Sequence, residues 1–271
     1  MMVRPTRPCQ DRDHWGALVK SQRRRAWELL GQTSTPDGSD VRLVVRGDEY
    51  VILVNGDTLM SSRMHGSEEA LATVACRQVQ SSERPRVLVG GLGMGFTLRS
   101  TLDLLPPDAI VTVAELVPAV VEWNRGPLGA LAGHPLNDPR VRIKAGEDVG
   151  NTLRLNPGRF DAILLDVDNG PAAFTESANH GLYNNAGVAA AFAALRVGGT
   201  LAVWSAWEDT KFEQRLRFHG FVAQVERVRA RLKKGGRWHT IFLGVKRAHR
   251  GASPVKRSRR RRPSQPTRTT H

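Results

Sequence analysis

The most constraining feature of this sequence is a repeated alternation of apolar strand-length segments and helical segments over residues 86–219. The expected strands are Arg86–Gly90, Ile110–Ala114, Val141–Ala145, Phe160–Leu165 and Thr200–Trp204. The expected helices between and after them are Phe96–Leu105, Pro118–Leu131, Val149–Leu155, Leu182–Leu195 and Glu208–His219. Near-continuous apolar strands that alternate with helices are typical of a parallel sheet buried on both faces. The pattern therefore predicts an α/β, Rossmann-like, doubly wound fold.

The last two expected strands change this plan. Phe221–Val228 and Trp238–Val245 are joined by a short loop that includes Lys233–Arg237. Strands joined so closely must be antiparallel. We therefore expect a seven-stranded, mostly parallel sheet with a C-terminal antiparallel hairpin.

The N-terminal part predicts a small β-hairpin subdomain. Val41–Arg46 and Tyr50–Val54 alternate in hydropathy around a glycine turn, and Thr58–Ser62 suggests a third strand. A helix is expected over Ser67–Gln80 with Ser67 as its N-cap. Another helix is plausible around Trp15–Leu30.

The chain thus divides into four expected segments: an Arg-rich polar segment (1–37), the hairpin subdomain (38–66), a nucleoside-binding domain (67–246) and a basic tail (247–271). Residues 246–271 hold ten Lys and Arg and no acidic residue, which leaves about +4 of the net charge of +14 for the remainder. A segment this polar cannot compensate its ordering entropy by burial, so the tail is expected to be disordered. Its charge would allow nonspecific contact with nucleic acid.

Several protein classes are excluded by composition. No apolar run approaches the ~20 residues of a membrane span, and the first residues lack the apolar core of a signal peptide. Cys9 and Cys76 have no metal-ligand spacing, which predicts free thiols, no metal site and a cytoplasmic location.

A glycine-rich turn follows the first strand of the alternation. Gly91, Gly93 and Gly95 are spaced as GxGxG, and Leu92 lies between them. Glycines allow close approach of a ligand to the backbone, and the next helix offers free N–H groups. Phe96 stands where the dinucleotide fingerprint requires its third glycine, which disfavours NAD-type binding.

Acidic residues end the next two strands. Glu115, followed by Leu116, lies twenty residues after Gly95, where a carboxylate can accept hydrogen bonds from both ribose hydroxyls. Glu147 and Asp148 follow the third strand, and either can bind an adenine amino group. Asp148 can equally cap the next helix.

The fourth strand ends in Asp166, with Asp168 two residues later. Carboxylates over the ligand crevice suit a cationic or amine substrate, since they can hold an ammonium group or accept a proton from nitrogen. Turn formation explains part of this segment but not Asp166. Trp204 and Trp207, after the fifth strand, are interpreted as core and rim packing.

Over residues 40–245 the chain resembles the spermidine synthase (polyamine aminopropyltransferase) family. The matching motifs are the N-terminal hairpin, the glycine loop at 87–95, Glu115, the segments at 138–148 and 160–166, and Leu182-Tyr183. The resemblance implies a methyltransferase-like sheet behind a small β-domain, often in a homodimer. It implies decarboxylated S-adenosylmethionine as co-substrate, an amine acceptor, Asp166 as catalytic residue, and Asp168, Tyr183 and His65 as substrate contacts. A surface role without a ligand is the alternative for His65.

The sequence departs from the family at two places that bear on the substrate. The family's glycine loop carries an aspartate that holds the aminopropyl ammonium, and here that position is Met94. The motif after the fourth strand usually reads Asp-Ser-x-Asp-Pro, and here Asn169 and Gly170 replace its last two residues. Three hypotheses follow: an aminopropyltransferase-like enzyme of polyamine metabolism, a methyltransferase that uses S-adenosylmethionine on another small molecule, and a non-catalytic nucleoside- or nucleic-acid-associated protein.

Overall fold

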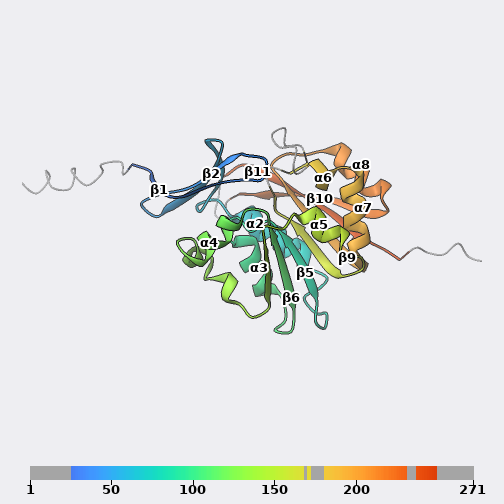
Figure 1. Cartoon of the computed structure of the whole chain (residues 1–271). Coiled ribbons are helices and arrows are strands. Elements are labelled where there is room, and N and C mark those ends of the chain that lie inside the picture. Colours follow the sequence, from blue (N-terminus) through green and yellow to red (C-terminus); the bar gives the residue numbers. More distant parts are fainter. Residues whose placement is uncertain (1–25, 168–169, 172–179, 231–235, 249–271) are drawn as a thin grey trace, which may run out of the picture.

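The computed structural model describes residues 26–167, 170–171, 180–230 and 236–248. They form two sheets, a seven-stranded sheet with helices on both faces and a four-stranded sheet beside it (Figure 1). The predictions for residues 1–25 and for the basic tail from residue 249 lie outside the described residues.

The large sheet has the order β10-β11-β9-β8-β5-β6-β7. Its strands are β5 (Arg86–Gly90), β6 (Ile110–Glu115), β7 (Val141–Ala145), β8 (Phe160–Leu165), β9 (Leu195–Ser205), β10 (Phe221–Arg229) and β11 (Trp238–Lys246). Strands β5 to β9 pair in parallel, and β11 is antiparallel to both β9 and β10. The predicted fold class is confirmed.

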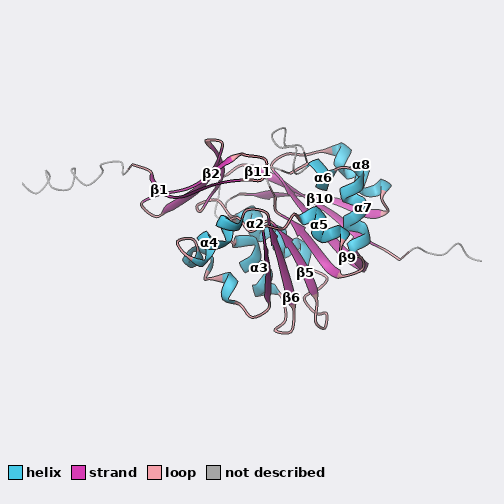
Figure 2. Ribbon diagram, in the orientation of Figure 1, coloured by secondary structure: helices cyan, strands magenta, loops and turns pink. Residues whose placement is uncertain are grey.

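Helices cover both faces of this sheet (Figure 2). They are α2 (Gly66–Cys76), α3 (Phe96–Leu104), α4 (Pro118–Arg125), α5 (Val149–Arg154), α6 (His180–Tyr183), α7 (Asn185–Ala194) and α8 (Thr210–Phe218), with 3₁₀ turns at Gly129–Ala132 and Pro135–Asn137. The side chains of β5 alternate between the two faces as a strand requires. Val87 and Val89 join the core with α2, α3 and α4, whereas Leu88 joins the core with α5, α7 and α8.

The small sheet has four antiparallel strands rather than a hairpin alone. They are β1 (Glu28–Ser34), β2 (Asp40–Arg46), β3 (Glu49–Val54) and β4 (Asp57–Ser61). The helix expected around Trp15–Leu30 is wrong at its C-terminal end, because residues from Glu28 pair with β2. Leu29 and Leu30 lie in β1 instead, because β2 supplies backbone hydrogen-bond partners along its length.

Three helices of the structure begin or end at other residues than the sequence predicted. The helix after β6 stops at Arg125, because Gly126-Pro127 interrupts it. The segment 182–195 is broken at Asn184, whose side chain accepts the Gly187 N–H at 3.0 Å and caps α7. Ser67 is not the N-cap of α2; that position is His65.

The small sheet shares its core with the large one. Val41, Leu43 and Ile52 are buried in the same apolar cluster as the α2, α3 and α4 side chains. The small sheet is therefore fixed against the domain, above the carboxyl ends of the parallel strands. Among the described helices, none has the length and apolar composition that crossing a lipid bilayer requires.

This shared core generates a stability prediction. Leu43 is fully buried, so Leu43→Ala should reduce the free energy of unfolding by ~2–5 kcal/mol. Denaturant unfolding followed by far-UV circular dichroism and by tryptophan fluorescence should still show one coincident transition. Leu29→Ala, on the adjacent strand at 54% exposure, is the matched control and should change stability by less than ~0.5 kcal/mol. Two separate transitions for Leu43→Ala would contradict a shared core.

Candidate active site

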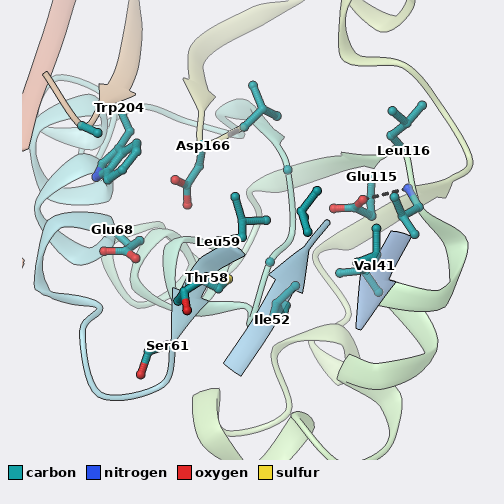
Figure 3. A pocket seen from close by; sticks show the side chains of 18 of the residues that line it. Val41, Ile52, Thr58, Leu59, Ser61, Glu68, Glu115, Leu116, Asp166 and Trp204 are labelled. Atoms are coloured by element: carbon teal, nitrogen blue, oxygen red, sulfur yellow. Dashed lines mark hydrogen bonds between the residues drawn. The ribbon is translucent and has the colours of Figure 1, made fainter. Parts of the chain in front are cut away.

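A cavity of about 840 Å³ lies between the small sheet and the carboxyl ends of the large sheet. Its volume is in the range of pockets that enclose a nucleotide-sized molecule. The small sheet contributes one wall, which includes Val41, Ile52, Leu59 and Met60. The carboxyl ends of β5, β6, β8 and β9, with the residues that follow them, contribute the opposite wall, which includes Gly91, Glu115, Asp166 and Trp204 (Figure 3).

The glycine loop after β5 forms the floor of this cavity. Gly91, Gly93 and Gly95 all have positive φ, of 86°, 51° and 82°. A Cβ atom at Gly91 would collide with the carbonyl oxygen of Asp166, and one at Gly93 would lie 2.8 Å from the Met60 sulfur. The loop is therefore pressed between β8 and β4, and only glycine fits.

Glu115, at the end of β6, holds this loop in place. Its carboxylate accepts the Leu92 N–H and the Val117 N–H, both at 2.8 Å. Burial raises the pKa of Glu115, and these backbone N–H groups oppose that shift. The Gly93 and Leu116 N–H groups also face this carboxylate and lower its pKa. Glu115 and Leu116, both predicted to contact the cofactor, line the cavity.

The two acidic residues after β7, Glu147 and Asp148, have different surroundings in the structure. Asp148 lines the cavity and also caps α5, because its carboxylate accepts the Asn151 N–H at 2.7 Å. Glu147 is not among the described lining residues and instead accepts a hydrogen bond from the Asn151 side chain at 3.2 Å. Of the two, only Asp148 is placed to contact a ligand in this cavity.

Asp166 ends β8 and lines the cavity directly beside the glycine loop. Its carboxyl group accepts a hydrogen bond from the Thr97 hydroxyl at 2.5 Å. Burial raises the pKa of Asp166 to about 6, and the Thr97 hydrogen bond opposes the shift. The strand order β8-β5-β6 thus brings Asp166, the glycine loop and Glu115 to one edge of the sheet.

Two of the three predicted substrate contacts, His65 and Tyr183, do not line the cavity, and the third lies outside the described residues. Among the described residues that line the cavity, neither His65 nor Tyr183 is present. His65 stacks on Phe96 at 4.2 Å between ring centroids, and its Nδ1 lies 2.6 Å from Glu69 Oε1. The Tyr183 hydroxyl donates to the Val167 carbonyl at 3.0 Å. Asp168 lies outside the described residues.

The remaining predicted nucleoside contacts, Leu92 and Gly95, are not among the described residues that line the cavity. The Leu92 side chain is buried and its N–H binds Glu115, while Gly95 is the N-cap of α3. No three His, Cys, Asp or Glu side chains of the described residues form a metal-binding group. Cys76 is a buried free thiol, and burial raises its pKa to about 12.

Sequence reasoning missed Glu68 as a site residue. Glu68 lies in the first turn of α2, is only 7% exposed, and lines the cavity (Figure 3). Burial and the nearby Asp166 charge raise the pKa of Glu68 to about 7, while the Ser67 hydroxyl opposes the shift. Acidic residues in a first helical turn are ordinary, so the position of Glu68 in the sequence gave no distinguishing signal.

The chain is similar in sequence and in fold to proteins of one class. No protein-family model matches the chain. A polyamine aminopropyltransferase of Corynebacterium efficiens is 30% identical over 179 residues, which is 62% of this chain and 31% of that protein. The chain thus spans about a third of the length of this curated relative.

Three solved structures share the fold. Spermidine synthase from Thermotoga maritima matches with a TM-score of 0.62 at 19% identity, over 80% of this chain and 72% of that one. A spermidine synthase in complex with the transition state analogue AdoDATO gives 0.63 at 22% identity, over 80% and 73%. A probable spermidine synthase from Corynebacterium glutamicum gives 0.56 at 18% identity, over 79% of each chain.

The two acids of the cavity predict a pH dependence of stability. Since the pKa values of Glu68 and Asp166 are raised in the folded state, the folded protein binds more protons than the unfolded chain. This stabilisation is fully present below about pH 4, and is lost as pH rises through 6 to 7. The free energy of unfolding of the unliganded protein should therefore fall by about 4 kcal/mol between pH 5 and 8, and the melting temperature should fall with it.

Matched variants separate this effect from other titrations. Glu68→Gln should flatten the fall, because the neutral amide has no proton to lose. Glu69→Gln, at the next position of α2 and 31% exposed, should keep the wild-type slope. An unchanged slope in Glu68→Gln would contradict the raised pKa of Glu68.

Taken together, the cavity at the carboxyl ends of the parallel strands, the shared sequence with a polyamine aminopropyltransferase and the shared fold confirm the resemblance of this chain to the spermidine synthase family.

Proposed function

We propose that this protein is a transferase that binds decarboxylated S-adenosylmethionine and transfers its aminopropyl group to an amine, in polyamine metabolism. One observation carries the proposal: Glu115, the glycine loop and Asp166 line a single cavity from three adjacent strands. The relative and the structural neighbours support the same reaction class, since their names specify aminopropyl transfer and spermidine synthesis.

The glycine loop and Glu115 fit the nucleoside half of such a substrate. The Glu115 carboxylate lines the cavity and can accept from ribose hydroxyls, and the absence of side chains at Gly91 and Gly93 lets a ligand approach the backbone. Asp148 lies at the same end of the cavity and has acceptor capacity for an adenine amino group. The adenosine half would thus lie over β5 and β6.

Asp166 fits the reacting half. The acceptor nitrogen attacks the carbon bonded to the sulfonium; a C–N bond forms, the C–S bond breaks, and its electron pair neutralises the sulfur. Methylthioadenosine is then the leaving product, and the nitrogen gives up one proton. A free alkyl amine has a pKa near ~10, so a base in reach of the nitrogen must accept that proton. A carboxylate with a raised pKa is a better proton acceptor than an ordinary aspartate.

Methyl transfer from S-adenosylmethionine is the second candidate, and one observation favours it. Arg237 lines the cavity and presents a guanidinium group that matches a carboxylate. Met94, in contrast, is fully buried and offers no group to the ligand.

Ligand-dependent thermal unfolding tests the proposed function. Decarboxylated S-adenosylmethionine, S-adenosylmethionine, methylthioadenosine and NAD would be added separately to the purified protein. A ligand at a hundredfold excess over its Kd should add ~2.7 kcal/mol of stability. We expect the largest shift with the decarboxylated form and none with NAD. A preference for S-adenosylmethionine would favour methyl transfer, and no response to any adenosyl ligand would refute the nucleoside site.

A substitution tests the role of Asp166. Asp166→Asn removes the proton acceptor with little change in shape, so kcat for the amine should fall by about 10²-fold or more. Asp103→Asn is the control, because that exposed carboxylate of α3 pairs with Arg99 away from the cavity. Retained turnover in Asp166→Asn, with methylthioadenosine still bound, would show that Asp166 is not the base.

A further inference from the structure

We propose that Glu68 is the specificity-determining residue of this site, and that it pairs with the ammonium group of the three-carbon chain of decarboxylated S-adenosylmethionine. The inference rests on the proposed function and identifies the chemical class that the site selects: a sulfonium nucleoside with an amine and without a carboxylate. Nothing in the motifs of the sequence assigns this role to Glu68.

The position of Glu68 is the first argument. In Figure 3 the carboxyl groups of Glu68 and Asp166 point into the same part of the cavity, near Trp204, and Glu115 lies on the other side. The nucleoside end and the acidic end of the cavity are therefore separate. A ligand whose ribose binds Glu115 extends its chain toward Glu68 and Asp166.

The second argument is the charge on the cavity wall. Among the described lining residues, four carboxylates oppose one guanidinium: Glu68, Glu115, Asp148 and Asp166 against Arg237. Glu115 and Asp148 each accept backbone N–H groups of a loop or helix, which accounts for their positions. Glu68 and Asp166 accept side-chain hydrogen bonds from the neutral hydroxyl groups of Ser67 and Thr97 respectively, and Glu68 also accepts a backbone N–H of its own residue.

Neither of these two acids has a cationic partner in the part of the chain that the structure describes. All the ion pairs there involve other carboxylates, such as Glu69 with His65 and Asp148 with Arg154. Two buried carboxylates in one cavity without a countercharge are unfavourable. A cation supplied by the ligand would offset the unfavourable burial of these two charges. A ligand with two positive charges would neutralise both Glu68 and Asp166.

A hydrogen-bonded chain fixes the carboxyl group of Glu68. The Ser67 hydroxyl donates to Glu68 Oε2 at 2.6 Å and lies 2.9 Å from His239 Nδ1. The Ser67 hydroxyl has one proton and donates it to Glu68. The His239 imidazole therefore donates its Nδ1–H to the Ser67 oxygen. Desolvation, and after it the charge of Arg237, lower the pKa of His239, which favours the neutral form of the ring. The arrangement orients Glu68 and leaves its negative charge for a ligand.

Glu68 and Asp166 would act against S-adenosylmethionine, whereas Arg237, which lines the same cavity, would act in its favour. The α-carbon of S-adenosylmethionine carries both an ammonium and a carboxylate, and that carboxylate would enter the part of the cavity that Glu68 and Asp166 occupy. Like charges in a site shielded from water repel strongly. The decarboxylated form keeps the ammonium and lacks the repelled group. Glu68 would thus hold the chain of the donor, while Asp166 remains available for the acceptor amine.

Calorimetric titration of the full chain with three ligands tests this inference. Decarboxylated S-adenosylmethionine carries the ammonium, methylthioadenosine lacks it, and S-adenosylmethionine adds the carboxylate. Wild-type protein should bind the decarboxylated form at least about tenfold more tightly than methylthioadenosine, as a charge-assisted hydrogen bond implies. Glu68→Gln should abolish that difference, leave methylthioadenosine affinity within about threefold, and reduce the preference over S-adenosylmethionine.

Control variants make the result specific. Glu69→Gln removes a charge from the same helical turn but outside the cavity lining, and should bind all three ligands as wild type does. Should Glu68→Gln fail to bind methylthioadenosine, Glu68→Asp carries the test, since it keeps the charge on a shorter side chain. A loss confined to the decarboxylated form supports the inference, and equal changes for all three ligands overturn it.

The outcomes also separate this inference from the proposed function. If wild-type protein binds none of the three ligands, the nucleoside site itself is wrong. If it binds methylthioadenosine and the decarboxylated form equally well, the nucleoside site stands and the role of Glu68 is refuted. An undiminished preference for the decarboxylated form in Glu68→Gln refutes it as well.

Discussion

The carboxylate of Glu115 joins two loops that would otherwise be independent, and the geometry of the cavity depends on this junction. One oxygen accepts an N–H from the glycine loop after β5, and the other accepts an N–H from the loop that begins α4. Burial works against the charge, and the oriented backbone dipoles compensate for it. The glycine loop in turn contacts Asp166 on one side and Met60 on the other. A single buried acid thereby sets the spacing between the strand ends and the small sheet.

The small sheet gives the cavity at this edge of the parallel sheet its second wall. Its side chains join the core formed by α2, α3 and α4, and others line the cavity wall. Burial of the acids at the strand ends strengthens their electrostatic interactions, because fewer solvent dipoles screen their charges. These acids interact over a longer range than they would on an exposed surface.

The sequence predicted the large sheet well, because strand and helix periods are local properties. The five parallel strands and the terminal hairpin lie where the apolar pattern placed them, within a few residues. β1 was missed because its residues become a strand only by pairing with β2, which propensity does not reveal. Glu115, Asp148 and Asp166 could be found because each follows a strand whose end is fixed by topology. Glu68 could not, since its role arises from the packing of α2 against the sheet, a tertiary contact without a local motif.

The location of Glu68 on α2 has an evolutionary consequence. The helix precedes β5 in the chain, so the residue that meets the acidic end of the cavity belongs to a different segment from the glycine loop and Glu115. In the proposed complex, recognition of the nucleoside and recognition of its side chain would be encoded by separate stretches of sequence. Substitutions in the first turn of α2 would then alter which charged groups the cavity accepts, while the glycine loop and Glu115 stay unchanged. Such modularity would give one scaffold a short mutational path between related sulfonium donors.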